Sequence, residues 1–136
     1  MIKLGVAIII ISHSNKIAEG LKELILQMAK ENVKVEAVGG IGSDSKALGS
    51  DPLKIKENIM KMSSEDGIAL VCDFGSTILS AKAVLKMLPE ELRKKVVILD
   101  TPLVEGAFTA AIEASTGASL EEVIKSAEEA RTFQKF

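Results

Sequence analysis

Short apolar runs alternate with longer amphipathic segments along this sequence of 136 residues. The first run, Leu4 to Ile11, contains no polar side chain, which is typical of a central strand that is buried on both faces. From Ser14 to Lys30, apolar residues recur every three or four positions between charged ones, which predicts an amphipathic helix. From Val33 to Val38, apolar and polar residues alternate, as expected for a half-buried outer strand.

The same pattern continues to the end of the sequence. Further strands are predicted over Gly67–Asp73 and Val96–Leu99, and further helices over Pro52–Met62, Ser76–Leu88, Leu103–Ala114 and Ser119–Arg131. Asp51 before Pro52 indicates an N-cap, and Ser119 with Glu122 forms a capping box. The segment from Gly39 to Gly49, rich in Gly, Ser and Asp, is predicted to be a long loop.

The alternation of strands and helices predicts an α/β fold, because parallel strands need crossover connections between them. We expect an open, mainly parallel sheet of four or five strands, in the order 2-1-3-4, with helices on both faces. Hydrophobic residues make up 47% of the sequence, enough to bury a core without disulfides or metal. Residues 1–136 are therefore interpreted as a single domain.

The composition excludes several classes of protein. The net charge is −2 with no strongly basic stretch, and Trp and Tyr are absent, which argues against nucleic-acid binding. One cysteine and one histidine cannot form an internal disulfide or a Cys/His zinc site, so no metal is expected. The first apolar run is too short to span a bilayer and lacks the features of a signal peptide. We expect a cytoplasmic protein.

The only histidine, His13, lies between the first predicted strand and the first predicted helix. Ligands of open parallel sheets bind at the carboxyl ends of the strands, and right-handed crossovers bring those ends to one edge. This position therefore favours a functional histidine, whose ring nitrogen can act as a nucleophile. The alternative is a loop histidine that only caps the first helix.

A second polar segment follows the third predicted strand, beginning at Asp73. If strands one and three are neighbours, Asp73 lies beside His13, where it can hold one ring nitrogen and leave the other free. The alternative role for Asp73 is the N-cap of the following helix. Hydroxyl and backbone N–H groups at a helix start suit phosphate oxygens. The residues predicted to bind phosphate or a partner are Ser14, Gly75, Ser76 and Thr77.

Other notable residues have simpler interpretations. Cys72 is expected to be a small buried hydrophobe, and the five methionines to pack in the core. Gly39-Gly40-Ile41-Gly42 is no dinucleotide-binding motif, because it follows the second strand and opens no helix. Ile17 and Leu21, at one end of the first helix, are candidates for a partner-binding patch.

Several segments together indicate a family. They are Ile11-Ser12-His13-Ser14 with Ala18-Glu19-Gly20-Leu21, Asp73-Phe74-Gly75-Ser76 with Leu79-Ser80-Ala81, Pro102-Leu103-Val104-Glu105-Gly106, and the loop from Gly40-Ile41 to Leu48-Gly49-Ser50-Asp51. They resemble the DhaM family, the phosphocarrier subunits of phosphotransferase-system-dependent dihydroxyacetone kinase. The histidine segment is shared with the mannose-family IIA components, whereas Pro102 to Gly106 separates the DhaM family from them.

This resemblance implies a specific role. His13 would be phosphorylated by the phosphocarrier protein HPr, itself charged from phosphoenolpyruvate by enzyme I, and Asp73 would orient its ring. The phosphoryl group would pass to ADP bound to the subunit DhaL, which phosphorylates dihydroxyacetone held by DhaK. The phosphohistidine is covalent, so no cofactor is implied. A homodimer is expected by analogy, and a chain ending at Phe136 would be the single-domain form that depends on separate HPr.

Two alternatives remain open from the sequence. A mannose-family IIA component would use the same histidine but deliver the phosphoryl group to a sugar-transport IIB protein. A non-catalytic regulatory module would bind a small anion at the same edge without forming phosphohistidine. A stand-alone hydrolase is disfavoured, because the sequence offers no Ser/His/Asp set.

Overall fold

A parallel sheet of four strands in the order β2-β1-β3-β4 forms the centre of the computed structural model, which describes residues 4–29 and 31–136. The strands are β1 (Val6–Ser12), β2 (Val35–Gly39), β3 (Gly67–Cys72) and β4 (Val96–Ile98). The predicted strand order and direction are confirmed, and the described residues supply four strands to this sheet rather than five. Leu4, predicted within the first strand, precedes it and is exposed.

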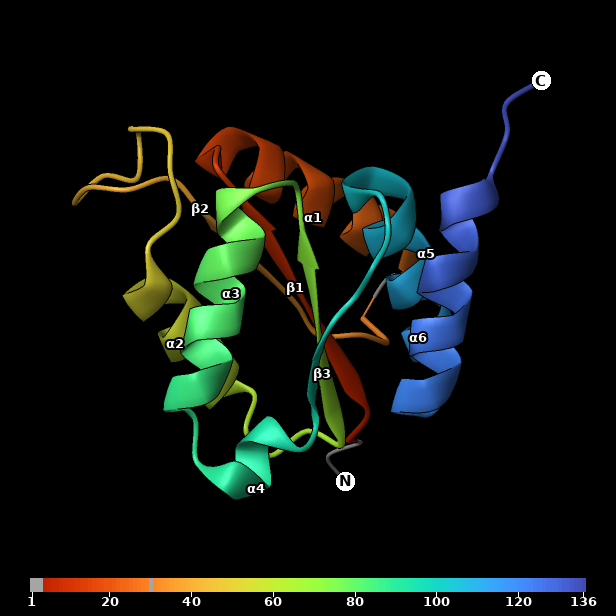
Figure 1. Ribbon diagram of the computed structural model, residues 1–136. Coiled ribbons are helices and arrows are strands. Elements are labelled where there is room, and N and C mark those ends of the chain that lie inside the picture. The colour runs from red at the N-terminus through yellow and green to blue at the C-terminus, as the bar shows by residue number, and fades with distance from the viewer. Residues whose placement is uncertain (1–3, 30) are drawn as a thin grey trace.

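Helices cover both faces of the sheet (Figure 1). One face is covered by α1 (Asn15–Ala29), α5 (Leu103–Ser115) and α6 (Leu120–Glu129), which continues into the short 3-10 helix η1 (Ala130–Thr132). The other face is covered by α2 (Pro52–Lys61), α3 (Ser76–Met87) and α4 (Glu90–Arg93). The protein therefore has three layers, as predicted for helices on both faces.

The central strand β1 is buried along its whole length, and its side chains alternate between the two cores. Ile8 and Ile10 pack towards α1 and α5, whereas Ile9 and Ile11 pack towards α2 and α3. Because both faces are covered, the strand requires apolar residues from Val6 to Ile11, and only its last residue, Ser12, is polar. Burial of each isoleucine contributes roughly 1.5–3 kcal/mol. This packing fixes the end of β1, and with it the start of the next loop.

Two helices begin at the capping residues that the sequence predicted. The Asp51 carboxylate accepts a hydrogen bond from the Leu53 N–H at 2.9 Å, and Ser119 with Glu122 forms the predicted capping box. The four residues of α4 were not expected, because a single turn is too short for a helical period to be recognised. Pro89 precedes this turn and ends the preceding chain segment in an extended conformation.

The predicted packing of the methionines is wrong for three of them. Met62 is buried, but Met28, Met60 and Met87 are exposed by 57%, 42% and 46% on the outer sides of their helices. Met1 lies outside the described residues. Among the residues described, no helix is both long and apolar enough to cross a membrane.

Candidate functional site

The register of β1 and β3 brings His13 and Asp73 together at the carboxyl edge of the sheet. Ile11 of β1 is paired with Cys72 of β3, so the residues that follow each strand are neighbours. The Asp73 N–H donates to the Ile11 carbonyl at 3.1 Å, which extends the strand pairing by one step. The predicted juxtaposition of His13 and Asp73 is therefore observed.

The carboxylate of Asp73 is the centre of a hydrogen-bond network. Its Oδ2 accepts from the Ser12 hydroxyl and from the His13 backbone N–H, both at 2.9 Å. Its Oδ1 lies 3.0 Å from Nδ1 of the His13 ring and accepts from the Thr77 hydroxyl at 2.8 Å. The Phe74 N–H also donates to Oδ1, at 2.7 Å. One carboxylate thus joins the ends of β1 and β3 to the start of α3.

This network keeps Asp73 ionised. Burial raises the pKa of the Asp73 carboxyl, but the hydrogen bonds from the His13 backbone, the Thr77 hydroxyl, the His13 ring and the Phe74 backbone outweigh burial and lower it to about 2. An ionised carboxylate can only accept hydrogen bonds, so Nδ1 of His13 must carry the proton between them. In the neutral ring, the other nitrogen, Nε2, then keeps its lone pair.

The free nitrogen of His13 faces the start of α3. Nε2 lies 2.6 Å from the hydroxyl of Ser76, which donates to it because Nε2 has no proton in this tautomer. The His13 side chain is 24% exposed, so Nε2 is close to solvent while Nδ1 is held from inside. The Thr77 and Ile78 N–H groups of α3 already donate to the Phe74 and Gly75 carbonyls. The part of the helix start that suits phosphate oxygens next to this nitrogen is therefore the exposed Gly75–Ser76 backbone.

The alternative capping roles of His13 and Asp73 are not observed. Ser14, not His13, caps α1, because its hydroxyl accepts from the Ile17 N–H at 3.3 Å. Gly75 is the N-cap residue of α3, which has no side-chain cap. Asp73 contacts the helix through the Thr77 hydroxyl and the N–H of Phe74, which precedes the helix.

The residues predicted to bind phosphate occupy different environments. Gly75 and Ser76 lie at the exposed start of α3, next to His13 Nε2. Thr77 is fully buried, and its hydroxyl donates to Asp73, so its geometry suits a positioning role. The Ser14 N–H donates to the Ser12 hydroxyl, so this backbone group is also occupied within the protein.

Several residues that the sequence reasoning missed support the site. Ser12 is completely buried and donates to Asp73. Gly39, at the end of β2, lies against the backbone of Ser14, where an added Cβ would come within 2.6 Å of the Ser14 carbonyl oxygen. Gly49 donates its N–H to the His13 carbonyl at 2.8 Å, which ties the β2–α2 loop to the histidine. The glycine-rich segment at Gly39 was the available signal for this close approach.

Two other sequence interpretations have definite outcomes. Cys72 is buried as predicted, and burial raises the pKa of its thiol to about 12, so it is not a thiolate nucleophile at neutral pH. Ile17 is 53% exposed, but Leu21 is only 5% exposed and packs in the core. The partner patch proposed at one end of α1 is therefore wrong for Leu21, which lies on the inner side of the helix.

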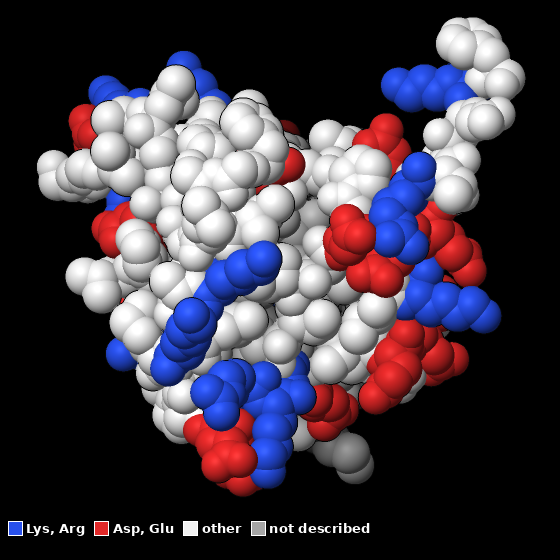
Figure 2. Space-filling model, in the orientation of Figure 1, with Lys and Arg blue, Asp and Glu red and all other residues white. Residues whose placement is uncertain are grey.

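Figure 2 shows an uneven distribution of charge. Charged side chains gather over the lower and right-hand parts of this face and form a blue band across α3, whereas the upper middle, over the start of α3, is largely uncharged. Few charges therefore surround the start of α3 on this face, where Ser76 contacts Nε2 of His13.

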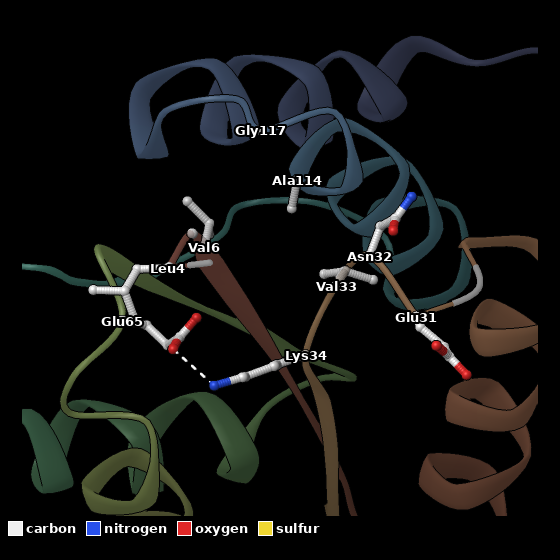
Figure 3. Close-up of a pocket in the computed structure, with 10 residues that line it drawn as sticks. Leu4, Val6, Glu31, Asn32, Val33, Lys34, Glu65, Ala114 and Gly117 are labelled. Carbon is white, nitrogen blue, oxygen red and sulfur yellow. Dashed lines mark hydrogen bonds and ion pairs between the residues drawn. The ribbon is translucent and has the colours of Figure 1, made fainter. Parts of the chain in front are cut away.

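A hollow of about 190 Å³ lies at the opposite, amino edge of the sheet (Figure 3). It is lined by the start of β1, the α1–β2 connection and the end of α5, and Glu65 lies on its wall. The buried Glu65 carboxylate pairs with Nζ of Lys34 at 2.9 Å, so its charge is compensated within the protein. Among the described residues, no cluster of three or more His, Cys, Asp or Glu side chains could hold a metal ion.

Comparison with known proteins identifies relatives of this chain. The family model of EIIA-man, the PTS system fructose IIA component, matches residues 7–124. The chain is 42% identical over 120 residues to the phosphoryl donor subunit DhaM of PEP-dependent dihydroxyacetone kinase 2 from Listeria innocua, and the match covers 88% of this chain and 94% of that protein. It is 35% identical over 120 residues to DhaM from Escherichia coli, but spans only 25% of that longer protein.

Solved structures agree with this fold. The crystal structure of EF1359, a protein of unknown function, has a TM-score of 0.87 and 36% sequence identity, and the match covers 98% of this chain and 99% of that one. The PTS IIA protein associated with the fucose utilization operon of Streptococcus pneumoniae has a TM-score of 0.63 at 17% identity, covering 98% and 96% of the two chains. At that identity the second likeness supports the fold alone.

Proposed function

We propose that this chain, which belongs to the family of PTS system fructose IIA components and to the DhaM phosphoryl donor subunits, accepts a phosphoryl group on His13 and passes it on for the phosphorylation of dihydroxyacetone. The observation that carries the proposal is the state of the His13 ring. Asp73 holds Nδ1, and Nε2 keeps a lone pair beside the start of a helix. A partly exposed nitrogen of this kind is a nucleophile that a second protein can reach.

The transfer needs only the ring and its carboxylate partner. The lone pair of Nε2 attacks the phosphorus of a phosphohistidine on the donor protein HPr, the new N–P bond forms, and the donor's own N–P bond breaks and returns its electron pair to the donor. The Nδ1 proton stays between His13 and Asp73, and the negative carboxylate stabilises the positive charge that the ring acquires. No cofactor enters this step.

The second transfer reverses the roles. A terminal phosphate oxygen of ADP, bound to the subunit DhaL, attacks the phosphorus, and the bond to Nε2 breaks with its electron pair left on the ring. ATP forms on DhaL and serves to phosphorylate dihydroxyacetone held by DhaK. Two proteins must therefore reach His13 in turn. Ile17 and Leu48 are both exposed and lie beside the site. The Ile17 N–H donates to the Ser14 hydroxyl, and Leu48 precedes Gly49, whose N–H donates to the His13 carbonyl.

The proposal extends to the domain organisation, the cellular compartment and the oligomeric state of the protein. Residues 1–136 act as one phosphocarrier domain, and the protein works in the cytoplasm. Two copies form a homodimer, for which exposed Leu24 and Met28, four residues apart on one side of α1, offer an apolar contact. Replacing Leu24 with lysine and measuring the mass in solution tests this contact, and an unchanged dimer would exclude it.

Intact-mass spectrometry tests the carrier function. The protein is incubated with enzyme I, HPr and phosphoenolpyruvate, and DhaL with bound ADP is then added. We expect one acid-labile phosphoryl group to appear and DhaL to remove it. The His13→Gln variant keeps a polar side chain of similar length and should gain nothing, because the sequence has one histidine. The Arg93→Gln variant, changed at an exposed residue of α4 at the opposite edge of the sheet, is the control and should load like the wild type.

The same experiment separates the alternatives. If DhaL does not remove the phosphoryl group but a sugar-transport IIB protein does, the chain would be a IIA component of a sugar-transport system. The match to the IIA component family model favours this second candidate function. Complete absence of loading would exclude a phosphocarrier and favour a module that binds an anion without turnover. Loading of the His13→Gln variant would move the site away from His13.

A further inference from the structure

The phenyl ring of Phe74 is stacked on the imidazole of His13. The two ring centroids are 4.6 Å apart and the planes meet at 20°. Phe74 is 66% exposed, although a phenylalanine of this size gains most when it is buried. Its contact with His13 therefore indicates a role of Phe74 in the functional site rather than in the hydrophobic core.

The local backbone directs this ring towards His13. The Phe74 N–H donates to Asp73, which in turn binds the His13 ring and backbone. The next residue, Gly75, has a φ of +50°, a conformation that side-chain-bearing residues rarely adopt. The turn from Asp73 to Gly75 thus brings an aromatic side chain over the imidazole that its neighbouring carboxylate holds.

Phosphorylation changes what holds the imidazole. In the free protein, Nδ1 is bound by Asp73 and Nε2 accepts from Ser76. Once Nε2 carries a phosphoryl group, its lone pair is used in the N–P bond and the hydrogen bond from Ser76 to Nε2 is lost. The imidazole is then held by one hydrogen bond only, at Nδ1. The Phe74 ring, which is stacked on the face of the imidazole, opposes rotation of the imidazole about this hydrogen bond.

We propose that Phe74 is a positioning residue for phosphoryl transfer: its ring fixes the plane of the His13 imidazole and so the direction in which Nε2 presents the phosphoryl group. This inference rests on the proposed function of His13. The stacking also places an aromatic face against a ring that becomes positively charged on phosphorylation, which favours the loaded state. The alternative for an exposed phenylalanine is an anchor that binds the partner protein.

Kinetics of loading separate positioning from docking. The maximal rate of phosphoryl uptake and the half-saturating concentration of phosphorylated HPr are measured for the wild type, Phe74→Leu and Phe74→Tyr. Leucine keeps apolar bulk without a flat ring, and tyrosine keeps the ring. For Phe74→Leu we expect the maximal rate to fall on the order of 2- to 10-fold, from the energy of an aromatic pair, with an unchanged half-saturating concentration. Phe74→Tyr should restore the rate.

The control is Leu53→Ala, which removes an apolar side chain of almost equal exposure, 65%, from α2. It should leave both constants unchanged. An unchanged maximal rate in Phe74→Leu would overturn the proposal, and so would a rise in the half-saturating concentration alone, which would make Phe74 a docking residue.

Side-chain NMR of the unphosphorylated protein provides a second measurement that does not depend on the carrier function. A Ser76→Ala background removes the hydrogen bond to Nε2, as phosphorylation does. In this background, the order parameters of the His13 ring C–H bonds should fall when Phe74→Leu is added and stay at the background value when Phe74→Tyr is added. If the wild type took no phosphoryl group from HPr, the proposed function would fail, and the order parameters would still decide whether Phe74 fixes the ring. Equal order parameters in all three proteins would overturn the inference.

Discussion

Replacing Asp73 with asparagine should weaken both the fold and the chemistry, because one carboxylate serves both. The asparagine amide has nearly the same shape, but it has a single acceptor oxygen. Its NH₂ group replaces either Oδ2, which accepts from the Ser12 hydroxyl and the His13 N–H, or Oδ1, which accepts from the Thr77 hydroxyl. The variant therefore loses the negative charge and some of the hydrogen bonds while the side-chain volume is preserved.

The size of the stability effect follows from the pKa of Asp73. Folding lowers this pKa from 3.8 to about 2, and one pKa unit corresponds to about 1.4 kcal/mol. Because solvent screens a partly exposed group, the ionised carboxylate adds at most about 2 kcal/mol to the free energy of unfolding. Because the folded pKa is the lower one, this contribution is complete above the unfolded pKa. It is lost as the pH falls from about 4 towards 2.

Urea unfolding followed by circular dichroism checks this result. We expect the unfolding free energy of Asp73→Asn to lie about 1–2 kcal/mol below that of the wild type at neutral pH, and the two proteins to converge near pH 2. Loading from phosphorylated HPr should slow by about 10- to 100-fold, the value of a charge-assisted hydrogen bond. Asp100→Asn is the control, because Asp100 is exposed and pairs with Arg131 at the surface. Equal stability of Asp73→Asn and wild type at neutral pH would refute the reasoning.

Two further substitutions test the surroundings of His13. Gly39→Ala places a Cβ within 2.6 Å of the Ser14 carbonyl oxygen, so the unfolding free energy should fall by about 1–3 kcal/mol in urea titrations, and loading should slow because the His13–Ser14 backbone moves. Its control is Gly20→Ala, where an added Cβ meets open space within α1 and stability should rise by about 0.5–1 kcal/mol; a stable Gly39→Ala protein would contradict the close approach. Ser76→Ala removes the hydroxyl at Nε2 and should slow loading without changing the urea midpoint, whereas an unchanged rate would assign Ser76 to the helix start alone.

The fold could be predicted because its determinants are local and periodic. The unbroken apolar run of β1 and the three- and four-residue period of α1 follow from burial on both faces of a strand and on one face of a helix. The order 2-1-3-4 made His13 and Asp73 neighbours without any knowledge of their side chains. The prediction failed for methionines at the outer surface, because Met28 and Met60 match an apolar pattern but lie on the exposed sides of their helices.

The rest of the site depends on contacts between segments far apart in the sequence. Ser12 was not recognised because a serine at the end of an apolar strand carries no sign of the carboxylate that it will bind. Thr77 was assigned to phosphate as part of a common Gly-Ser-Thr turn, whereas the register of β1 and β3 directs its hydroxyl to Asp73. The stacking of Phe74 on His13 likewise depends on the φ of Gly75, which a sequence pattern cannot supply.

The hydrogen bond from the Gly49 N–H to the His13 carbonyl connects a surface loop to the proposed site of phosphoryl transfer. Surface loops vary in sequence more than the elements that they connect, whereas the transfer reaction requires a fixed histidine. Residues 41–44 and 46–48 of the β2–α2 loop are exposed, while the two ends of the loop are fastened beside His13 through Gly39 and Gly49. Changes at the exposed tip leave the hydrogen bonds of Asp73 untouched, yet they alter the surface next to His13. Partner choice can therefore diverge during evolution while the transfer reaction stays the same.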